Sequence, residues 1–422
     1  MQLKIGYHDG LFAMYTIKIY CPNVISGYGG AENYALLLAA YLFNNYKNIE
    51  ITIVTKAVIE EEAILDKDKI LQDFNKKYSL QLPDNLRFII LPENDNASII
   101  SKFIAHNKLR RTSKDADLFI NAFHNVHFFY GKKNVHVIHF PAAPRVQASP
   151  FFTKYKFLMP IAKLLDTRYR ACYDLFICNS AFTKKWLIHY WTISENRIEI
   201  LYPPILTQDK YKKEQNRRDK DKIDKKEKII LIISRFDPRK KIIELVDFFI
   251  ENSALFQEWQ LAIAGSVDKR YRSYIEEIEK KAIGHRIVLY KNIEPIDLVC
   301  LYQKASIFWH AMGLNVDEEK NAIDVEHFGM TTVEAMSAGV VPIVINKGGQ
   351  KEIVDHGING FKWNNLEELR AYTCTVMQDK TLQQSLALAA MEKSKTFSRE
   401  SFYQHADEIF KRHHLIPEEY RR

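Results

Sequence analysis

Residues 325–339 read V-E-H-F-G-M-T-T-V-E-A-M-S-A-G, and the interpretation of the rest of the chain starts from them. Two carboxylates, Glu326 and Glu334, stand on either side of a predicted helix start, and residues 340–345 then read as a buried strand. This order of loop, helix and strand is one unit of an alternating α/β fold. Because a helix start presents unpaired N–H groups and the positive end of a dipole, an anionic ligand is expected there.

The same residues also allow a purely structural interpretation. Thr331 and Glu334 have the spacing of a capping box, in which the glutamate only returns to the start of its own helix. On spacing alone the capping box is the commoner explanation, so the choice between a cap and a site rests on the surrounding sequence.

The surrounding sequence resembles a known family. Residues 326–334 are similar to the E-x7-E motif of the retaining, nucleotide-sugar-dependent glycosyltransferases of family 4, and the similarity continues through Pro342, the turn at 348–352 and Gly360. The resemblance implies an α/β protein with the GT-B fold, in which two Rossmann-like domains face each other across a cleft. Within the family, E-H-F-G resembles the subset that includes dolichol-pathway mannosyltransferases and bacterial relatives, and it favours GDP-mannose as the donor.

Size and composition agree with a two-domain soluble enzyme. At 422 residues the chain suits two domains of about 200 residues each. Its content of 47% hydrophobic and 27% charged residues is ordinary for a globular protein. Five cysteines without a C-x-x-C pair predict reduced thiols and argue against a zinc site.

A charged segment predicts the domain boundary. Sixteen of the twenty residues in 209–228 are charged, and with almost no aliphatic side chains they cannot form a core. We therefore predict an acceptor-side domain at 1–208, a linker at 209–228, a nucleotide-sugar-binding domain at 229–396 and a C-terminal helix at 397–422 that packs back toward the first domain. Ten of the sixteen charges are basic, so the linker accounts for half of the net charge of +8, and no nucleic-acid partner is expected.

The chain is expected to be cytoplasmic. No signal peptide and no run of about eighteen apolar residues can be recognised in it. Residues 150–170 interleave aromatic and aliphatic side chains with lysines and arginines, as in helices that lie on anionic membranes. Two interpretations stay open, a peripheral contact at the inner membrane face and a core helix whose lysines point outward.

A glycine-rich loop near the N-terminus predicts close approach of the backbone to a ligand. Candidate strands at 3–7 and 17–20 both lead toward Gly29-Gly30-Ala31-Glu32 and an apolar helix. Glu32 occupies the place of the third glycine of a dinucleotide fingerprint, which argues against a dehydrogenase. The loop instead resembles the G-G-x-E element of family 4, which faces the diphosphate and the acceptor.

His139 closes a predicted strand at 135–139, and the carboxyl ends of parallel strands are where ligand sites lie. It resembles the family histidine beside the sugar and diphosphate of the donor. The alternative is an ordinary structural histidine.

Two cations follow the first predicted strand of the second domain. Residues 229–234 lead into R-F-D-P-R-K, which resembles the family pattern G-R-x-x-x-E-K with Ser234 in place of Gly and Arg239 in place of Glu. The resemblance assigns Arg235 and Lys240 to the diphosphate. Cations at a helix start oppose its dipole, which favours an anionic ligand over the alternative of surplus surface charge.

No metal and no separate cofactor are expected. The three D-x-D triplets do not follow strands, as the metal-binding pair of GT-A transferases does, and we interpret them as solvated surface. They are Asp66/Asp68, Asp115/Asp117 and Asp219/Asp221. The diphosphate would be neutralised by arginine, lysine and helix-end N–H groups.

The sequence therefore predicts a retaining hexosyltransferase that uses a nucleoside diphosphate sugar and a glycan, lipid-linked or other hydroxyl acceptor. By resemblance, the catalytic residues are Glu326 and His139. The donor-binding residues are Gly30, Arg235, Lys240, Gly329, Met330, Thr331 and Glu334. The alternatives are a glycoside hydrolase or nucleotide-sugar epimerase that uses Glu326 and Glu334 as acid and base, and a non-catalytic glycan- or membrane-binding partner.

Overall fold

The computed structural model describes most of the chain. The described residues are 14–22, 24, 30–58, 71–72, 75, 82, 86–93, 107–123, 131–143, 154–205, 223 and 225–422. The candidate strand at 3–7 and most of the predicted linker lie outside them. The other candidate first strand, 17–20, lies within β1.

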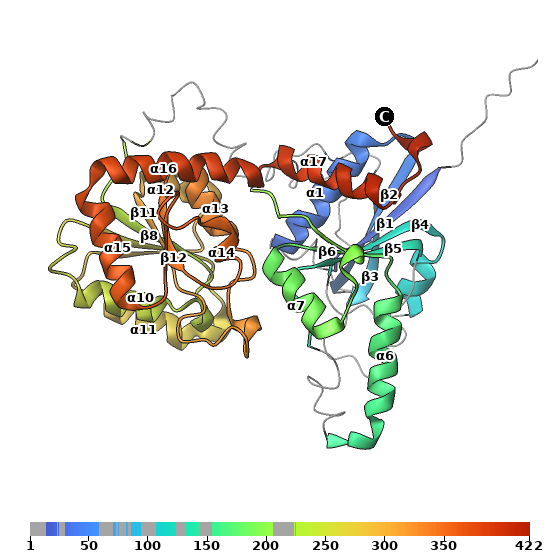
Figure 1. Cartoon of the computed structure of the whole chain (residues 1–422), viewed down its shortest axis with the longest axis horizontal. Helices are drawn as coiled ribbons and strands as arrows, with labels where there is room; N and C mark the ends of the chain where they lie inside the picture. Colours follow the sequence, from blue (N-terminus) through green and yellow to red (C-terminus); the bar gives the residue numbers. More distant parts are fainter. Residues whose placement is uncertain are drawn as a thin grey trace, which may run out of the picture.

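Within the described residues, the first domain holds a parallel sheet of seven strands in the order β3-β2-β1-β4-β5-β6-β7 (Figure 1). The strands are β1 (Tyr15–Tyr20), β2 (Ile49–Val58), β3 (Arg87–Glu93), β4 (Ala116–Asn121), β5 (Gly131–Ile138), β6 (Leu175–Cys178) and β7 (Ile198–Ile200). Helix α1 (Gly30–Asn45) follows β1, and α7 (Ala181–Trp191) follows β6. The strand order reverses between β1 and β4, the place where open α/β sheets bind ligands.

The second domain repeats this plan with a parallel sheet of six described strands in the order β10-β9-β8-β11-β12-β13. The strands are β8 (Ile229–Ile233), β9 (Gln260–Gly265), β10 (Ile287–Lys291), β11 (Ile307–His310), β12 (Val341–Ile345) and β13 (Phe361–Trp363). The strand β8 is Ile-Ile-Leu-Ile-Ile and is buried throughout, as expected for a strand covered on both faces. Here the order reverses between β8 and β11.

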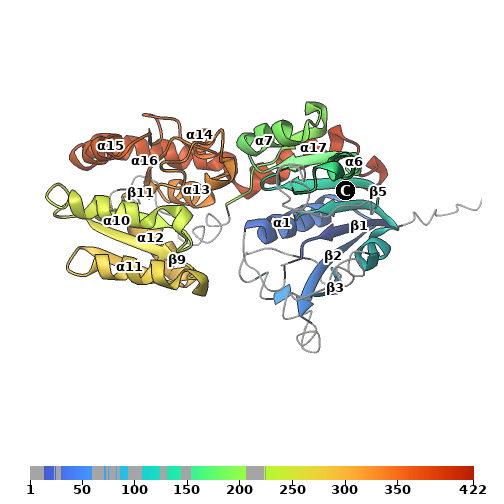
Figure 2. The same ribbon diagram turned by 90° about the horizontal axis from the view of Figure 1, so that it is seen from below.

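Helices surround this second sheet, and α13 among them contains residues of the 325–339 motif. They are α10 (Ile242–Glu251), α11 (Arg272–Ala282), α12 (Pro295–Lys304), α13 (Met330–Ser337), α14 (Gln350–Ile353), α15 (Leu366–Gln378) and α16 (Lys380–Ser394). The two domains lie side by side when viewed from below (Figure 2). The chain therefore has two parallel-sheet α/β domains, as predicted.

The last helix, α17 (Arg399–Arg412), leaves the second domain and lies on the first, with α16 and α17 running along the top of Figure 1. Phe402, Ala406 and Ile409 are buried in the same core as residues of α1. The ring of Phe402 packs edge-on against Tyr34 at 5.2 Å between centroids. The C-terminal segment thus contributes to the core of the N-terminal domain.

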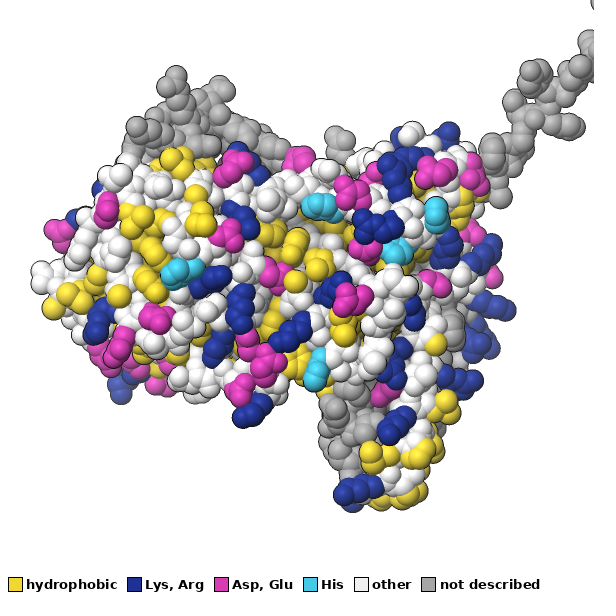
Figure 3. Space-filling view, in the orientation of Figure 1, with side chains coloured by type: hydrophobic (Ala, Val, Ile, Leu, Met, Phe, Trp, Pro, Cys, Tyr) yellow, Lys and Arg dark blue, Asp and Glu magenta, His cyan; other side chains and the backbone are white. Residues whose placement is uncertain are grey.

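Helix α6 (Met159–Ala171) projects from the body of the first domain (Figures 1 and 3). Among its residues only Ala162 and Tyr169 are buried. The interpretation of 150–170 as a core helix is therefore wrong for its described part, because most of its apolar side chains stay in contact with solvent. In the described part of the chain, no helix is both long and apolar enough to cross a bilayer.

Candidate active site

A cavity of about 480 Å³ lies between the two domains. Every predicted site residue except Glu334 lines it: Gly30, His139, Arg235, Lys240, Glu326, Gly329, Met330 and Thr331. Residues that follow β8 and the last residue of β11 contribute to its wall, so the cavity lies at the point where the strand order of the second sheet reverses. Parallel-sheet topology thus brings together residues that are far apart in the sequence.

The helix α13 starts at this cavity without a capping side chain. Its N-cap is Gly329, which has a φ of 119°, and no side chain accepts a hydrogen bond at this end. Other residues rarely adopt this φ, and a Cβ atom on Gly329 would also lie 2.6 Å from the amide nitrogen of Gln350, so the position favours glycine. A capping box with Thr331 as N-cap is therefore not formed.

Glu334 lies outside the cavity lining. Its Oε2 accepts a hydrogen bond of 2.7 Å from the hydroxyl of Tyr302 on α12. The side chain is partly exposed, and it lies one turn beyond the helix start at the cavity. The two glutamates of the motif therefore have different surroundings.

Glu326 carries a stable negative charge inside the cavity wall. Its Oε2 atom lies 2.7 Å from Nζ of Lys240 and 3.2 Å from Nε2 of His310. Burial opposes ionisation, but the charge of Lys240 and the hydrogen bond with His310 outweigh it and hold the pKa of Glu326 well below its usual range. The side chain is an acceptor at neutral pH.

The backbone of Glu326 is fixed by the glycine turn after β12. The N–H of Gly349 donates to the carbonyl oxygen of Glu326 at 2.8 Å. A Cβ on Gly348 would lie 2.1 Å from the same oxygen, so the turn needs glycine to approach this closely. The turn at 348–352, which is part of the resemblance to the family, therefore holds the backbone of the 325–339 motif in place.

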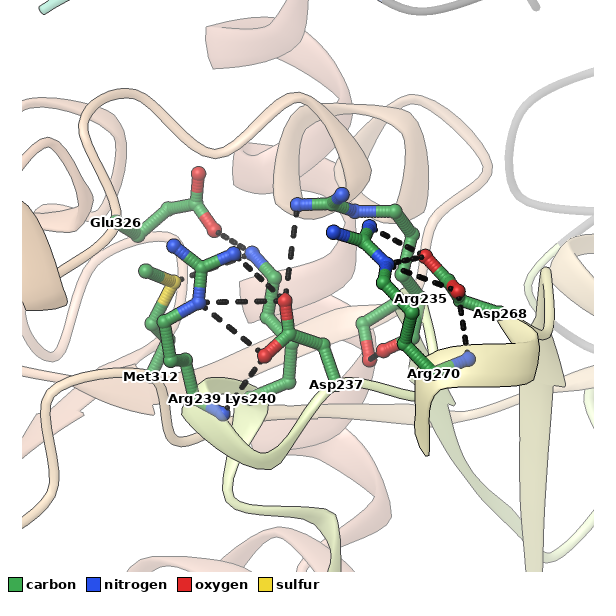
Figure 4. A network of polar contacts seen from close by, with 9 residues as sticks. Arg235, Asp237, Arg239, Lys240, Asp268, Arg270, Met312 and Glu326 are labelled. Carbon is green, nitrogen blue, oxygen red and sulfur yellow. Dashed lines mark hydrogen bonds and ion pairs between the residues drawn. The ribbon is translucent and has the colours of Figure 1, made fainter. Parts of the chain in front are cut away.

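Arg235 and its neighbours form a cationic wall (Figure 4). Asp237 is held by Arg239, with 2.7 Å between Nη2 and Oδ2, whereas Arg235 lies 3.9 Å from the same oxygen. Burial opposes ionisation of Asp237, yet the bonds from Arg239 and the charge of Arg235 keep its pKa below the usual value. The carboxylate of Asp237 is already bonded to Arg239, and the side chain of Arg235 is 61% exposed. Arg235 is therefore available to an anion.

The first domain meets this wall with a helix start and a histidine. Gly30 begins α1, and a Cβ there would lie 3.1 Å from Sδ of Met330, so the starts of α1 and α13 approach closely. His139 follows β5 directly, and its ring packs edge-on against Tyr34 at 5.7 Å. Both residues line the cavity from the side of the first domain.

Direct bonds join the two domains beside the cavity. The carboxylate of Glu352 on α14 accepts hydrogen bonds of 2.8 Å from the N–H groups of Ala181 and Phe182, at the start of α7. It also accepts 3.0 Å from the hydroxyl of Tyr202. Burial raises the pKa of Glu352, although these three donors act in the opposite direction. Glu352 belongs to the turn at 348–352, for which the sequence predicted no contact with the first domain.

The residue after Glu326 forms a second connection. The carbonyl oxygen of His327 accepts a hydrogen bond of 2.7 Å from Ser180 Oγ, and its ring stacks on Phe140 with centroids 4.0 Å apart. Phe140 directly follows His139, so this stack connects the surroundings of the two predicted catalytic residues.

Sequence reasoning also missed His310. Its only local signal was a histidine at the end of an apolar strand before a polar loop, the same signal that singled out His139.

Metal ligands are not grouped in the described part of the chain, where no cluster of three or more His, Cys, Asp or Glu side chains could hold an ion. Asp117 is engaged by the N–H of Thr16 at 2.8 Å and by Nζ of Lys132 at 2.7 Å. The other two D-x-D triplets, at 66–68 and 219–221, lie outside the described residues.

Comparisons with known proteins agree with this architecture. Residues 213–393 match the family Glycosyl transferases group 1, and residues 28–209 match Glycosyltransferase Family 4. The crystal structure of Anabaena HepE in complex with UDP and glucose superposes with a TM-score of 0.64 at 16% identity, over 94% of this chain and 99% of that chain.

Similar curated proteins match over shorter lengths. Sucrose synthase 2 of Pisum sativum is 31% identical over 143 residues, which are 33% of this chain and 18% of that protein. Alpha-1,3/1,6-mannosyltransferase ALG2 of Rhizomucor pusillus is 29% identical over 215 residues, which are 44% of this chain and 46% of that protein. The matched regions thus span less than half the length of these relatives. Glycosyltransferase family models match both domains, and a solved structure matches the fold over nearly the whole chain. The protein therefore belongs to the group 1 glycosyltransferases of the GT-B fold.

Proposed function

We propose that this protein is a retaining hexosyltransferase that moves a sugar from a nucleoside diphosphate donor to a hydroxyl acceptor. The observation that carries the proposal is the interdomain cavity, in which an ionised glutamate, two cations and an uncapped helix start meet. The cations and the helix start suit a diphosphate, and Glu326 suits the hydroxyl groups and developing positive charge of a hexose.

In the proposed reaction the bond between the anomeric carbon and the β-phosphate oxygen breaks. The acceptor oxygen forms its bond on the same face, and its proton passes to the leaving phosphate. Arg235, Lys240 and the N–H groups at the start of α13 stabilise the leaving diphosphate, as preorganised donors do in a low-dielectric cleft. His139 and Gly30 complete the cleft from the first domain.

A hydrolase or epimerase that uses Glu326 and Glu334 as acid and base is less well supported. Of the two glutamates only Glu326 lines the cavity, whereas Glu334 lies outside the lining and accepts a hydrogen bond from Tyr302. A hydrolase would also leave Arg235 and Lys240 without a purpose, because its substrate carries no diphosphate.

Mannose is the sugar that we propose, because the similarity to a mannosyltransferase extends over 44% of the chain and the E-H-F-G motif favours it. A thermal-shift screen with GDP-, UDP- and dTDP-sugars tests the donor. A ligand at about one hundred times its Kd should stabilise the protein by about 2.7 kcal/mol. If no GDP-sugar raises the melting temperature and another nucleotide sugar clearly does, GDP-mannose is not the donor.

Turnover tests the reaction class. We expect nucleoside diphosphate release that depends on acceptor, survives EDTA and gives a product with the anomeric configuration of the donor by NMR. We expect Glu326→Gln to lower kcat by a factor that corresponds to about 2 to 4 kcal/mol. Release without acceptor, or inversion at the anomeric carbon, contradicts the proposal.

We further propose a peripheral membrane contact through α6, in keeping with a lipid-linked acceptor and a cytoplasmic enzyme at the inner membrane face. Ile161, Leu164 and Leu165 are exposed and share one face of the helix, and Phe157 just before it is 76% exposed. Exposed basic residues accompany them: Lys154, Lys156, Lys163 and Arg168. An apolar stripe flanked by cations suits an anionic bilayer.

Vesicle sedimentation tests this contact. We expect binding to vesicles that contain phosphatidylglycerol but not to neutral phosphatidylcholine vesicles, and loss of binding in a Phe157→Ser/Leu164→Ser variant. Ile283→Ser is the matched control, because Ile283 is 77% exposed on the second domain. Equal loss in both variants contradicts a specific role of α6.

A further inference from the structure

The two carboxylate oxygens of Glu326 have different partners. Lys240 and His310 both contact Oε2. Within the described part of the chain, Oε1 has no hydrogen-bond partner, and Figure 4 shows one oxygen directed at Lys240 and the other away from it. Glu326 lines the cavity, so Oε1 is the oxygen left to meet a ligand there.

The protonation of His310 follows from its contacts. An ionised carboxylate only accepts hydrogen bonds, so Nε2 of His310 carries the proton that is shared with Glu326. Nδ1 is buried and has no hydrogen-bond partner among the described residues, which disfavours a second N–H there. Burial lowers the pKa of His310, although Glu326 acts in the opposite direction. His310 is therefore a neutral donor at physiological pH.

The two partners of Oε2 differ in rigidity. Lys240 reaches Glu326 with a flexible four-carbon chain, and its ammonium group has three donors that can also serve a phosphate. His310 is 5% exposed at the end of β11, so the strand and the packing around it hold its ring in one place. If Lys240 turns toward a bound diphosphate, His310 remains as the fixed partner of Glu326.

We propose that His310 is a positioning residue that holds Oε2 of Glu326 so that Oε1 faces the hexose of the donor. The proposal rests on the proposed glycosyl transfer. In this proposal His310, at the end of β11, keeps the carboxylate of Glu326 oriented while Lys240 binds the leaving diphosphate. His310 itself need not touch the substrate.

The kinetic test compares His310→Phe with His310→Gln. Phenylalanine fills the space without a donor, and we expect it to lower kcat ten- to one-hundredfold while the Kd for the nucleoside diphosphate stays within about twofold. Glutamine offers an amide N–H and should restore part of kcat. The acid limb of the pH profile of kcat should move to higher pH in His310→Phe, because Glu326 loses a donor that favours its ionised form.

A matched control comes from another histidine–glutamate pair. Nε2 of His413 lies 2.8 Å from Oε1 of Glu199, and neither residue lines the cavity. We expect His413→Phe to leave kcat and its pH profile unchanged. A similar fall of kcat in both variants would indicate general loss of structure and overturn the proposal.

A second measurement does not depend on turnover. A 13C NMR titration of labelled Glu326 should show a higher pKa in His310→Phe than in the wild type. Equal pKa values, or an unchanged kcat in His310→Phe, overturn the positioning role. Absence of sugar transfer by the wild type, together with the expected pKa change, would instead overturn the proposed function and leave the orientation of Glu326 by His310 in place.

Discussion

Two helices begin at the domain interface, and their first turns are satisfied in different ways. At the start of α7, two N–H groups donate hydrogen bonds to the carboxylate of Glu352 from the other domain. The N-cap is Ser180, whose Oγ accepts a hydrogen bond from the N–H of Thr183. At the start of α13, the N-cap is a glycine and no side chain caps the helix. The first residues of α13 line the interdomain cavity instead.

The difference separates a structural anion site from a ligand site. A helix start favours a negative charge wherever it occurs, so its presence alone does not identify a site. The start of α7 already holds a carboxylate of the protein itself, whereas the start of α13 is available to an anion that enters the cavity. Substitutions at the start of α13 should therefore change ligand affinity, and substitutions at the start of α7 should change stability.

The largest effect is expected from Gly329→Ala. The positive φ and the contact with Gln350 should displace the start of α13, and we expect a loss of nucleoside diphosphate affinity of about 3 kcal/mol, roughly one hundredfold. Gly284→Ala is the matched control, because Gly284 has a φ of 80° with open space around it. Calorimetry on both variants should show reduced affinity only in the first. Equal affinities would mean that α13 does not hold the diphosphate.

A smaller loss is expected from Arg235→Ala. Removing one charged donor from a diphosphate should cost about 2 kcal/mol in nucleoside diphosphate binding and much less in nucleoside monophosphate binding. Arg272→Ala, which removes an exposed arginine paired with Glu276, serves as the control. If monophosphate binding falls as much as diphosphate binding, Arg235 does not contact the second phosphate.

A substitution at the start of α7 should change the stability of the protein and the contact between its domains rather than donor binding. Glu352→Ala leaves two N–H groups and the Tyr202 hydroxyl without their acceptor and should weaken the contact between the domains by about 1 to 2 kcal/mol. Small-angle scattering measures the relative position of the domains, and thermal unfolding measures stability. An unchanged scattering profile and melting temperature would show that this bond does not hold the domains together.

The charge of Glu352 adds a pH dependence to the same comparison. Because its pKa is raised in the folded protein, Glu352 stabilises the fold below the pKa of an unfolded glutamate, and this contribution is lost as pH rises through the raised pKa. Glu352→Gln should remove this dependence. We expect the wild type to gain stability relative to Glu352→Gln as pH falls from 7 toward 4, and denaturant titrations at several pH values test this.

The smallest effect is expected from Glu334→Gln. If Glu334 binds the ribose, the change should raise the donor KM about fivefold, about 1 kcal/mol, and leave kcat nearly unchanged. Because Gly329 is the N-cap, the melting temperature should hardly change. A fall in stability without a change in KM would favour a structural role for Glu334 through its bond to Tyr302.

Local sequence was sufficient for the architecture. Short continuous apolar runs such as 229–233 are typical of strands covered on both faces, and their alternation with helices favours parallel sheets. The motif residues around Glu326 and the cations Arg235 and Lys240 were singled out by their resemblance to family motifs, with their places near predicted helix starts as additional support.

Tertiary structure alone decided which partners these residues have. Glu352 is about 170 residues from Ala181, and Glu326 is 86 from Lys240, so no local pattern records either contact. Thr331-x-x-Glu334 has capping-box spacing, but Gly329 takes the N-cap position and Tyr302 binds the glutamate. Sequence by itself determined the two sheets and the residues at their strand ends, because burial and periodicity are local properties. The packing of one domain against the other determined which helix start is occupied and which is open, because those contacts join distant parts of the chain.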